Sequence, residues 1–259
     1  MTLNKLVLGL SLALFALPMS ALAQDAAEDT DNPAQSTGEA DQAPEAGSDE
    51  EVAESNLSWN LSVTSDYVFR GVTQSNFKPA VQGGLDYAFG DSGFYAGVWG
   101  SNIDFDDSEG PNIELDSYIG WSHDLSEAWN LDLSVVHYAY LGESEAYGSI
   151  NYNEFIVKNT WNEMLTFTVG YAPDYSNSDV ESWYYNLGGT WDIGNDFSVN
   201  AGIGRTTFDD DAFSFDYNDW NIGVSRQFGP VNAALNYYDT NIDGPRVSDT
   251  VVLTLGFEG

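Results

Sequence analysis

The chain has 259 residues, with 41 acidic residues against 7 lysines and arginines, and it contains no cysteine. The net charge of −34 argues strongly against a nucleic-acid-binding protein, because phosphate contacts need a basic surface. The absence of cysteine excludes a disulfide framework, a zinc-thiolate site and a cysteine nucleophile.

The first 23 residues have the pattern of an export signal. Lys5 is the only charged residue, Leu6–Leu17 is apolar, and Ala21–Ala23 forms an A-x-A cleavage site. The apolar run is too short to span a membrane as a helix. We expect cleavage between Ala23 and Gln24, and a retained helical anchor is the alternative.

The next segment, Gln24–Ser55, predicts a disordered acidic linker. It carries 11 acidic residues, no basic residue and no aromatic residue. Such a composition cannot bury enough apolar surface to offset the entropy lost on ordering. Cation capture or a periplasmic partner remains an alternative role for this segment. After Ser55 the chain has 30 acidic and 6 basic residues, a net charge of −24.

From Asn56 to Gly259 the dominant pattern is a period of two, which is typical of β-strands with two different faces. Leu57, Trp59 and Leu61, for example, alternate with polar residues. The closing stretch repeats the pattern, since Leu253, Leu255 and Phe257 share one strand face. An apolar final strand with a terminal aromatic is typical of the barrels that the bacterial barrel-assembly machinery inserts. We therefore expect these three residues to form the barrel-closing signal.

The connections between the expected strands alternate in length. Five are short: Gly90–Ser92, Asp124–Ala128, Asn162–Glu163, Ile193–Asp196 and Gly229–Pro230. Six are longer and polar: Val72–Lys78, Asp106–Pro111, Gly142–Asn151, Asp174–Glu181, Asp209–Asp216 and Asn241–Val247. Eleven connections join twelve strands, with both ends of the barrel sequence on the side of the short turns. Short periplasmic turns and long outer loops are the rule for outer-membrane barrels.

The apolar strand faces favour a membrane barrel over a soluble sandwich or lipocalin. The strands are about 9–12 residues long, which suits a tilted membrane span. Their apolar faces carry almost no charge, and the opposite faces are small and polar, as a wet lumen requires. Aromatic residues at strand ends suggest interfacial girdles. They are Tyr67, Phe69, Tyr87, Phe89, Trp121, Trp161, Tyr171, Trp183, Trp191, Phe228, Tyr237 and Phe257.

Four short sequence motifs give the chain a family resemblance. They are SDYVFRGV (Ser65–Val72), KPAVQGG (Lys78–Gly84), GFYAGVWGSN (Gly93–Asn102) and IELD (Ile113–Asp116). Together they resemble the TorF-family porins. The resemblance implies an outer-membrane barrel and a pore, without a known substrate, and it does not include the acidic linker.

Nine charged residues are predicted by strand parity to face the lumen: Asp66, Arg70, Asp86, Glu114, Asp116, Asp132, Glu154, Lys158 and Asp192. Rings of side-chain charge set the selectivity of a pore, so this set predicts a negative lumen. The alternative is that Arg70 and Lys158 pair with neighbouring carboxylates and brace the wall.

Other sites have weaker patterns. One outer loop contains four acidic residues, Asp104, Asp106, Asp107 and Glu109. They are either hydrated loop residues, or they attract cations to the pore mouth, or they bind Ca²⁺ or Mg²⁺, although they lack the spacing of an EF-hand. Neither His123 nor His137 is placed beside an evident serine nucleophile and carboxylate, and no G-x-S-x-G turn occurs. We therefore expect neither an enzyme nor a cofactor.

The sequence thus predicts an all-β, antiparallel up-and-down transmembrane β-barrel of about twelve strands over residues 56–259, located in the bacterial outer membrane. Its partners would be outer-membrane lipids, the barrel-assembly machinery and small solutes or ions. The expected function is passive diffusion, with a preference for cations or neutral solutes. The alternative is a non-conducting structural or adhesin-like barrel whose lumen is narrowed by Tyr95, Trp99, Tyr118, Tyr138, Tyr140 and Tyr184.

Overall fold

The computed structural model of the chain describes residues 56–209 and 216–259. The expected signal peptide and acidic linker lie outside the described residues. Within the described part, no helix is both long and apolar enough to cross a membrane.

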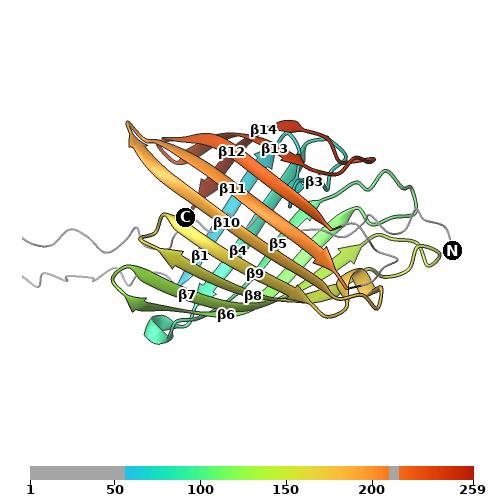
Figure 1. The fold of residues 1–259 in the computed structure, drawn as a ribbon, viewed down its shortest axis with the longest axis horizontal. Coiled ribbons are helices and arrows are strands. Elements are labelled where there is room, and N and C mark those ends of the chain that lie inside the picture. Colours follow the sequence, from blue (N-terminus) through green and yellow to red (C-terminus); the bar gives the residue numbers. More distant parts are fainter. Residues whose placement is uncertain (1–55, 210–215) are drawn as a thin grey trace, which may run out of the picture. The chain divides into compact units, whose positions relative to one another are not determined.

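Twelve antiparallel strands close into one barrel, as the sequence predicts (Figure 1). They are β1 (Leu57–Thr64), β4 (Ala80–Ala88), β5 (Phe94–Asn102), β6 (Ile113–Ser126), β7 (Trp129–Leu141), β8 (Tyr152–Trp161), β9 (Leu165–Ala172), β10 (Ser182–Gly194), β11 (Phe197–Phe208), β12 (Tyr217–Phe228), β13 (Val231–Thr240) and β14 (Thr250–Glu258). Each strand pairs with its neighbours, so no sheet edge is left open to lipid.

The barrel closes between its first and last strands. Leu61 is the Cα partner of Phe257, and Val63 is the partner of Leu255. Beyond β14, Gly259 donates its N–H to the carbonyl of Trp59 at 3.1 Å and accepts the Trp59 N–H at 2.7 Å. The final strand therefore completes the ring.

Long and short connections alternate around the ring and separate the two ends of the barrel. The short turns, which include the 3₁₀ turn η2 (Gly90–Ser92), lie at one end, together with the start of β1 and the end of β14. The longer connections, which include η3 (Tyr175–Asn177), lie at the other end. We call the end with the longer loops the outer end and the end with the short turns the inner end.

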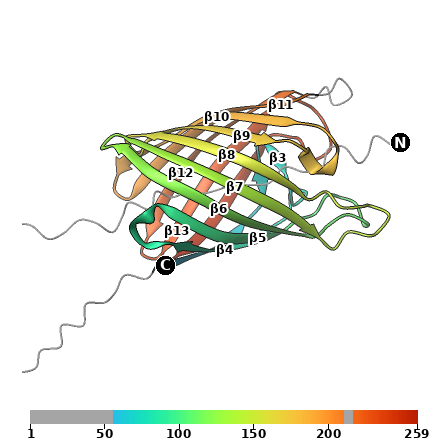
Figure 2. The same ribbon diagram turned by 90° about the horizontal axis from the view of Figure 1, so that it is seen from below.

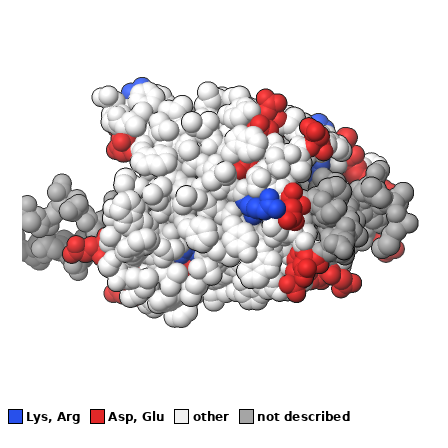
Figure 3. All heavy atoms as spheres, in the orientation of Figure 1, with Lys and Arg blue, Asp and Glu red and all other residues white. Residues whose placement is uncertain are grey.

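The surface of the barrel is apolar where the strands cross the membrane. Val81, Ile203 and Val251, on three different strands, are 56%, 58% and 60% exposed. Figure 3 shows a middle zone with few charges, whereas acidic residues gather towards one end. Since soluble proteins rarely expose such continuous apolar surface, the strands face lipid. The chain therefore forms a transmembrane barrel.

The first strand is shorter than its alternation suggests. β1 ends at Thr64, whose hydroxyl donates to the Asp66 carbonyl at 2.8 Å, and the chain then leaves the wall. Two short strands follow, β2 (Val68–Phe69) and β3 (Val72–Thr73), which pair with each other. In Figure 2, β3 lies within the ring of strands. We call Ser65–Pro79 the hairpin segment.

Two predicted girdle residues therefore have a different location. Tyr67 and Phe69 do not face lipid; they are buried in the hairpin segment, 1% and 3% exposed. The assignment of Asp66 and Arg70 to a wall strand was wrong for the same reason. The other girdle residues of the strands do lie on or near the lipid face, and Phe89 and Phe228 are about half exposed (49% and 52%).

Candidate functional site: the lumen and its hairpin segment

The hairpin segment fills much of the outer half of the lumen. Tyr67, Phe69 and Val72 are buried in a cluster with inward-facing aromatic residues of the wall. The Tyr67 ring meets the Trp99 ring edge-on at 5.5 Å between centroids. Among the wall residues of this cluster are Tyr138, Tyr140, Tyr152, Tyr217 and, from the loop after β9, Tyr175. The prediction of a wet lumen is therefore wrong for the outer half, because the hairpin segment occupies it. The strand pattern does not predict this whole segment as a loop.

Arg70, at the tip of the hairpin, reaches the barrel wall. Its Nη2 donates to Glu154 Oε1 at 2.8 Å and to Oε2 at 2.9 Å. The side chains of this ion pair are only 6% and 2% exposed. The guanidinium carbon lies 3.9 Å from the centroid of the Tyr184 ring and 4.6 Å from that of Phe69. Two of the predicted lumen charges are therefore brought together, although Arg70 arrives from a loop.

The turn of the hairpin needs an unusual backbone. Arg70 and Gly71 have φ angles of 45° and 78°, and positive φ at both central residues is what a type I′ turn requires. A Cβ on Gly71 would lie 2.3 Å from Thr240 Cγ2 and 3.0 Å from Asp219 Cβ. The tip therefore packs directly on β12 and β13, where only glycine fits.

Asp66 organises the hairpin segment from within. Its Oδ1 accepts a 2.9 Å hydrogen bond from Ser75 Oγ and a short one from Thr73 Oγ1. Burial raises the pKa of the Asp66 carboxyl above its ordinary value, although these hydrogen bonds oppose the shift. Asp66 is thus a structural residue of the segment and does not line an open path.

Glu114 and Asp116 face inward from β6 and are both fully buried. Their Cα partners on β7 are Tyr140 and Tyr138, which belong to the aromatic cluster. Within the described residues, neither carboxylate oxygen of Asp116 has a hydrogen-bond partner. The two predicted lumen charges therefore lie on the wall but behind the hairpin segment.

The inner half of the lumen is different. Tyr118 donates to Asp86 at 2.5 Å, and Tyr95 donates to Asp132 at 2.8 Å. Lys158 is the Cα partner of Asp132, yet the described residues contain no ion pair between them. The charges predicted by parity on these strands, Asp86, Asp132 and Lys158, therefore do line the inner lumen together.

Asp192 lies at the inner rim. Its side chain has inward parity on β10 but is exposed, and its Oδ1 accepts the Gly194 N–H at 2.6 Å. It therefore stabilises the turn to β11 and adds negative charge at the inner mouth.

An amide cluster faces inward from β11, β12 and β13. Asn200 Nδ2 donates to Asn236 Oδ1 at 2.9 Å and to Asn221 Oδ1 at 3.4 Å. The space comes from glycines: a Cβ on Gly223 would lie 1.8 Å from Asn236 Oδ1. This part of the inner lumen is polar and uncharged.

The acidic residues of the outer loop accept hydrogen bonds from the loop itself and from the hairpin segment. Asp104 Oδ2 accepts a 2.5 Å hydrogen bond from Lys78, which lowers the pKa of the Asp104 carboxyl. Asp106 Oδ1 accepts from Asn76 at 3.2 Å, and Asp107 Oδ1 accepts the Glu109 N–H at 2.9 Å. Across residues 56–209 and 216–259, no three His, Asp or Glu side chains are grouped to hold a metal ion.

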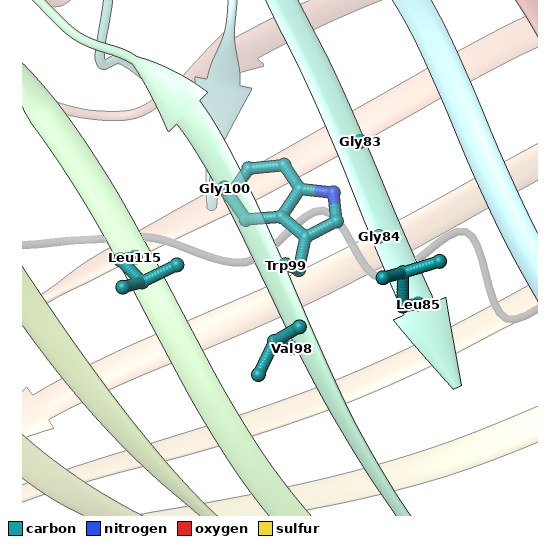
Figure 4. Close-up of a pocket in the computed structure, with 7 residues that line it drawn as sticks. All are labelled: Gly83, Gly84, Leu85, Val98, Trp99, Gly100 and Leu115. Atoms are coloured by element: carbon teal, nitrogen blue, oxygen red, sulfur yellow. The ribbon is translucent and has the colours of Figure 1, made fainter. Parts of the chain in front are cut away.

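An apolar groove lies on the wall between β4, β5 and β6 (Figure 4). It is lined by Gly83, Gly84, Leu85, Val98, Trp99, Gly100 and Leu115. Gly83 and Gly100 are Cα partners, so the surface is low where they meet. Leu85, Val98 and Leu115 are exposed, which places the groove on the lipid-facing side.

A family model matches residues 48–254 and describes a bacterial protein family of unknown function, Gcw_chp. The chain belongs to this family. The match begins before β1 and ends within β14. A search of curated proteins found no match.

Outer-membrane channels are among the solved structures with similar folds. The KdgM porin in complex with disordered oligogalacturonate is 7% identical, with a TM-score of 0.49, over 78% of this chain and 96% of that chain. The NanC porin is 12% identical (0.47; 77% and 97%), and the COG4313 outer membrane channel from Pseudomonas putida F1 is 14% identical (0.46; 84% and 99%). At TM-scores below 0.5, these similarities carry no argument about selectivity.

Two buried charges of the outer half are absent from the predicted set. Asp219, on β12, has inward parity with Tyr217, a signal that the sequence does offer. Its Oδ1 accepts a hydrogen bond from Tyr184 at 3.3 Å. Arg246, in the loop before β14, lies over the Phe105 ring at 4.6 Å, and its carbonyl accepts the Thr73 N–H at 3.2 Å. Nothing local in the sequence indicates the contact of Arg246.

Proposed function

We propose that this protein is an outer-membrane channel for passive diffusion of small solutes, with a preference for cations. The observation that carries the proposal is the charge of a polar lumen within a closed barrel. Its inner half presents Asp86, Asp132 and Asp192 against Lys158. A net negative wall attracts cations and repels anions, which argues against acidic solutes such as acidic sugars. The TorF-family resemblance agrees with a pore, and the proposed route involves no catalysis.

The hairpin segment makes this a restricted channel. In the proposal, diffusion through the outer half requires the segment to move or to leave gaps between its side chains and the wall. A non-conducting barrel is the second candidate, and the observation that favours it is the aromatic cluster that fills the outer half.

One variant separates the two candidates. Thr64 and Ala80 are Cα partners on neighbouring strands, so Asn-Gly in place of Ser65–Pro79 would join them by a two-residue hairpin. Refolded wild type and this variant are compared in planar bilayers across a KCl gradient. We expect greater conductance for the variant and a reversal potential that indicates cation preference for both.

Three other outcomes of this comparison would contradict or narrow the proposal. Anion preference in either protein would overturn the cation proposal. Silent wild type with a conducting variant would show that the hairpin segment closes the channel. No conductance in either protein, with the barrel folded by its heat-dependent gel mobility, would establish the non-conducting barrel.

A further inference from the structure

The wall that receives Arg70 has the chemistry of a binding site in its own right. Its parts come from four strands: Tyr138 on β7, Glu154 on β8, Tyr184 on β10 and Asp219 on β12. We call these four residues the guanidinium site. Only Arg70 and Phe69 belong to the hairpin segment, so the site is a property of the barrel wall.

We propose that the guanidinium site binds guanidinium groups of solutes that enter the lumen, and that Arg70 occupies the site as an internal substitute for them. This inference rests on the proposed channel function and names a class of solute for it. In the structure, the segment that restricts the channel is held by the same kind of group that the wall would recognise.

The shape of the site suits a planar cation. The Tyr184 ring lies 3.9 Å from the guanidinium carbon of Arg70, within the range of a cation–π contact. The Tyr138 hydroxyl donates to Glu154 Oε2 at 3.0 Å and fixes the carboxylate that Arg70 contacts. A planar guanidinium combines stacking with several in-plane donors, which the compact ammonium of lysine cannot do.

Some hydrogen-bonding groups at the guanidinium site are left without partners when Arg70 occupies it. Both Glu154 oxygens accept from one nitrogen, Nη2, whereas Arg70 Nε has no hydrogen-bond partner among the described residues. Asp219 Oδ2 is likewise buried without a partner there. A free guanidinium group is not tethered to a hairpin, and its donors point in several directions, so it could satisfy both carboxylates.

Glycines keep the space in front of the site open. A Cβ on Gly170 would lie 2.6 Å from Glu154 Oε1 and 3.3 Å from Arg70 Nη2. A Cβ on Gly204 would lie 2.4 Å from Asp219 Oδ2 and 2.5 Å from the Tyr184 hydroxyl. Any larger residue at either position would displace the groups that hold the cation.

Charge balance links binding to the position of the hairpin. The wall supplies two buried carboxylates, Glu154 and Asp219, and Arg70 brings one positive charge. If the hairpin withdraws alone, both carboxylates lose their counter-cation, and their mutual repulsion is no longer offset. A solute guanidinium that takes the place of Arg70 restores the charge, so solute entry and hairpin release favour each other.

The test uses the full-length mature chain with Arg70→Ala, refolded in detergent, and ethylguanidinium as the probe. The probe stays at or below about 20 mM, far below the molar range in which guanidinium salts denature proteins. A ligand that binds the folded state raises its melting temperature with a saturable concentration dependence. We expect this saturable rise for R70A, and a smaller rise at higher probe concentration for wild type, where the probe must first displace Arg70.

Four controls make the result specific. N-ethylurea, which is neutral, and NaCl at equal ionic strength should give no saturable shift. R70A/E154Q should bind ethylguanidinium about 30-fold more weakly, because it lacks the charge that anchors the cation. Arg205→Ala removes an exposed arginine that pairs with Asp216 at 3.0 Å, and it should behave as wild type.

The inference is overturned if R70A and R70A/E154Q respond equally, or if N-ethylurea matches ethylguanidinium; Arg70 would then be only an anchor of the hairpin. If R70A does not refold, the Asn-Gly replacement of Ser65–Pro79 exposes the same wall and takes the same titration. Binding in detergent requires no ion flux, so failure of the channel proposal would be visible separately as absent conductance.

Discussion

The outer and inner halves of this lumen are built by the same strands yet have opposite characters. In the outer half, Tyr138 and Glu154 are fully buried against the hairpin segment. In the inner half, Asp132 and Lys158 are only half-buried, although they continue the same inward faces of β7 and β8. Strand alternation decides which residues point inward, but a loop decides whether that interior is packed or open.

The two halves also treat charge differently. The outer half confines Arg70 with Glu154 in a dry environment, where an ion pair is costly to break. In the inner half, tyrosine hydroxyls hold Asp86 and Asp132 along a half-buried wall. Charge thus stabilises a buried contact in the outer half, whereas in the inner half it lines the wall of the lumen.

We expect the largest effect from Glu154→Gln, which removes the carboxylate that holds Arg70 in the outer half. Arg70 would lose its carboxylate while buried, at a cost of about 3–5 kcal/mol to hairpin docking. Trypsin should then cleave after Arg70, whose side chain is 6% exposed in the native barrel. Mass spectrometry of the fragments measures the rate.

Asp192→Asn is the matched control, because it removes an exposed inner-rim carboxylate. It should leave Arg70 protected, and Lys78 offers no competing cleavage site because Pro79 follows it. Equal protection of Arg70 in E154Q and wild type would contradict the contrast between the two halves.

Gly71→Ala should release the hairpin by a steric route. The substitution combines a positive φ of 78° with a Cβ only 2.3 Å from Thr240 Cγ2. We expect a loss of about 1–3 kcal/mol of stability and faster trypsin cleavage after Arg70. Gly90→Ala separates the two causes, because Gly90 also has a positive φ, 57°, but nothing within 4 Å. If both variants protect Arg70 equally, close packing at the tip is not what holds the segment.

A smaller effect is expected from Tyr95→Phe and Tyr118→Phe in the inner half. Each removes one hydrogen bond to a lumen carboxylate, Asp132 or Asp86, worth about 1 kcal/mol. The freed carboxylate should increase cation preference, measured as a reversal-potential shift in the Asn-Gly variant. An unchanged potential would mean that these carboxylates do not set the field of the path.

The smallest expected effect is a pH dependence of hairpin docking through Asp66. Burial raises the pKa of its carboxyl above the ordinary 3.8, so between the two values the docked state binds more protons than the unfolded state. This contribution is therefore fully present at the acidic side of the window and is lost as the pH rises through the raised pKa. The difference in melting temperature between wild type and Asp66→Asn, followed from pH 4 to 7, isolates it. A difference that is constant with pH would exclude it.

The sequence predicts the barrel well because each strand carries its own alternation. β4, with Val81 and Leu85 outward and Gln82 and Asp86 inward, is found with the expected faces. The inward parity of Glu114, Asp116, Glu154 and Lys158 follows from the same local rule, and so does that of Asp219, which the predicted set omits.

The sequence pattern does not predict the hairpin segment, because its apolar residues alternate in the same way as those of a wall strand. Tyr67 and Phe69 are apolar and spaced like lipid-facing residues, yet both are buried inside the barrel. The available signal is Arg70-Gly71 between two β-prone pairs, a candidate two-residue turn. The contact of Arg70 with Glu154 spans 84 residues, so no local pattern could reveal it.

The partners of the hairpin tip also fix an order of assembly. Arg70 comes early in the chain, but Glu154, Tyr184 and Thr240 come progressively later. The tip cannot have its complete set of contacts until β13 is in place, because Thr240 is the last residue of that strand. A barrel whose strands are inserted only as far as β12 therefore lacks part of the surface on which the hairpin tip docks. The docked hairpin is in this sense a mark of a wall built as far as β13.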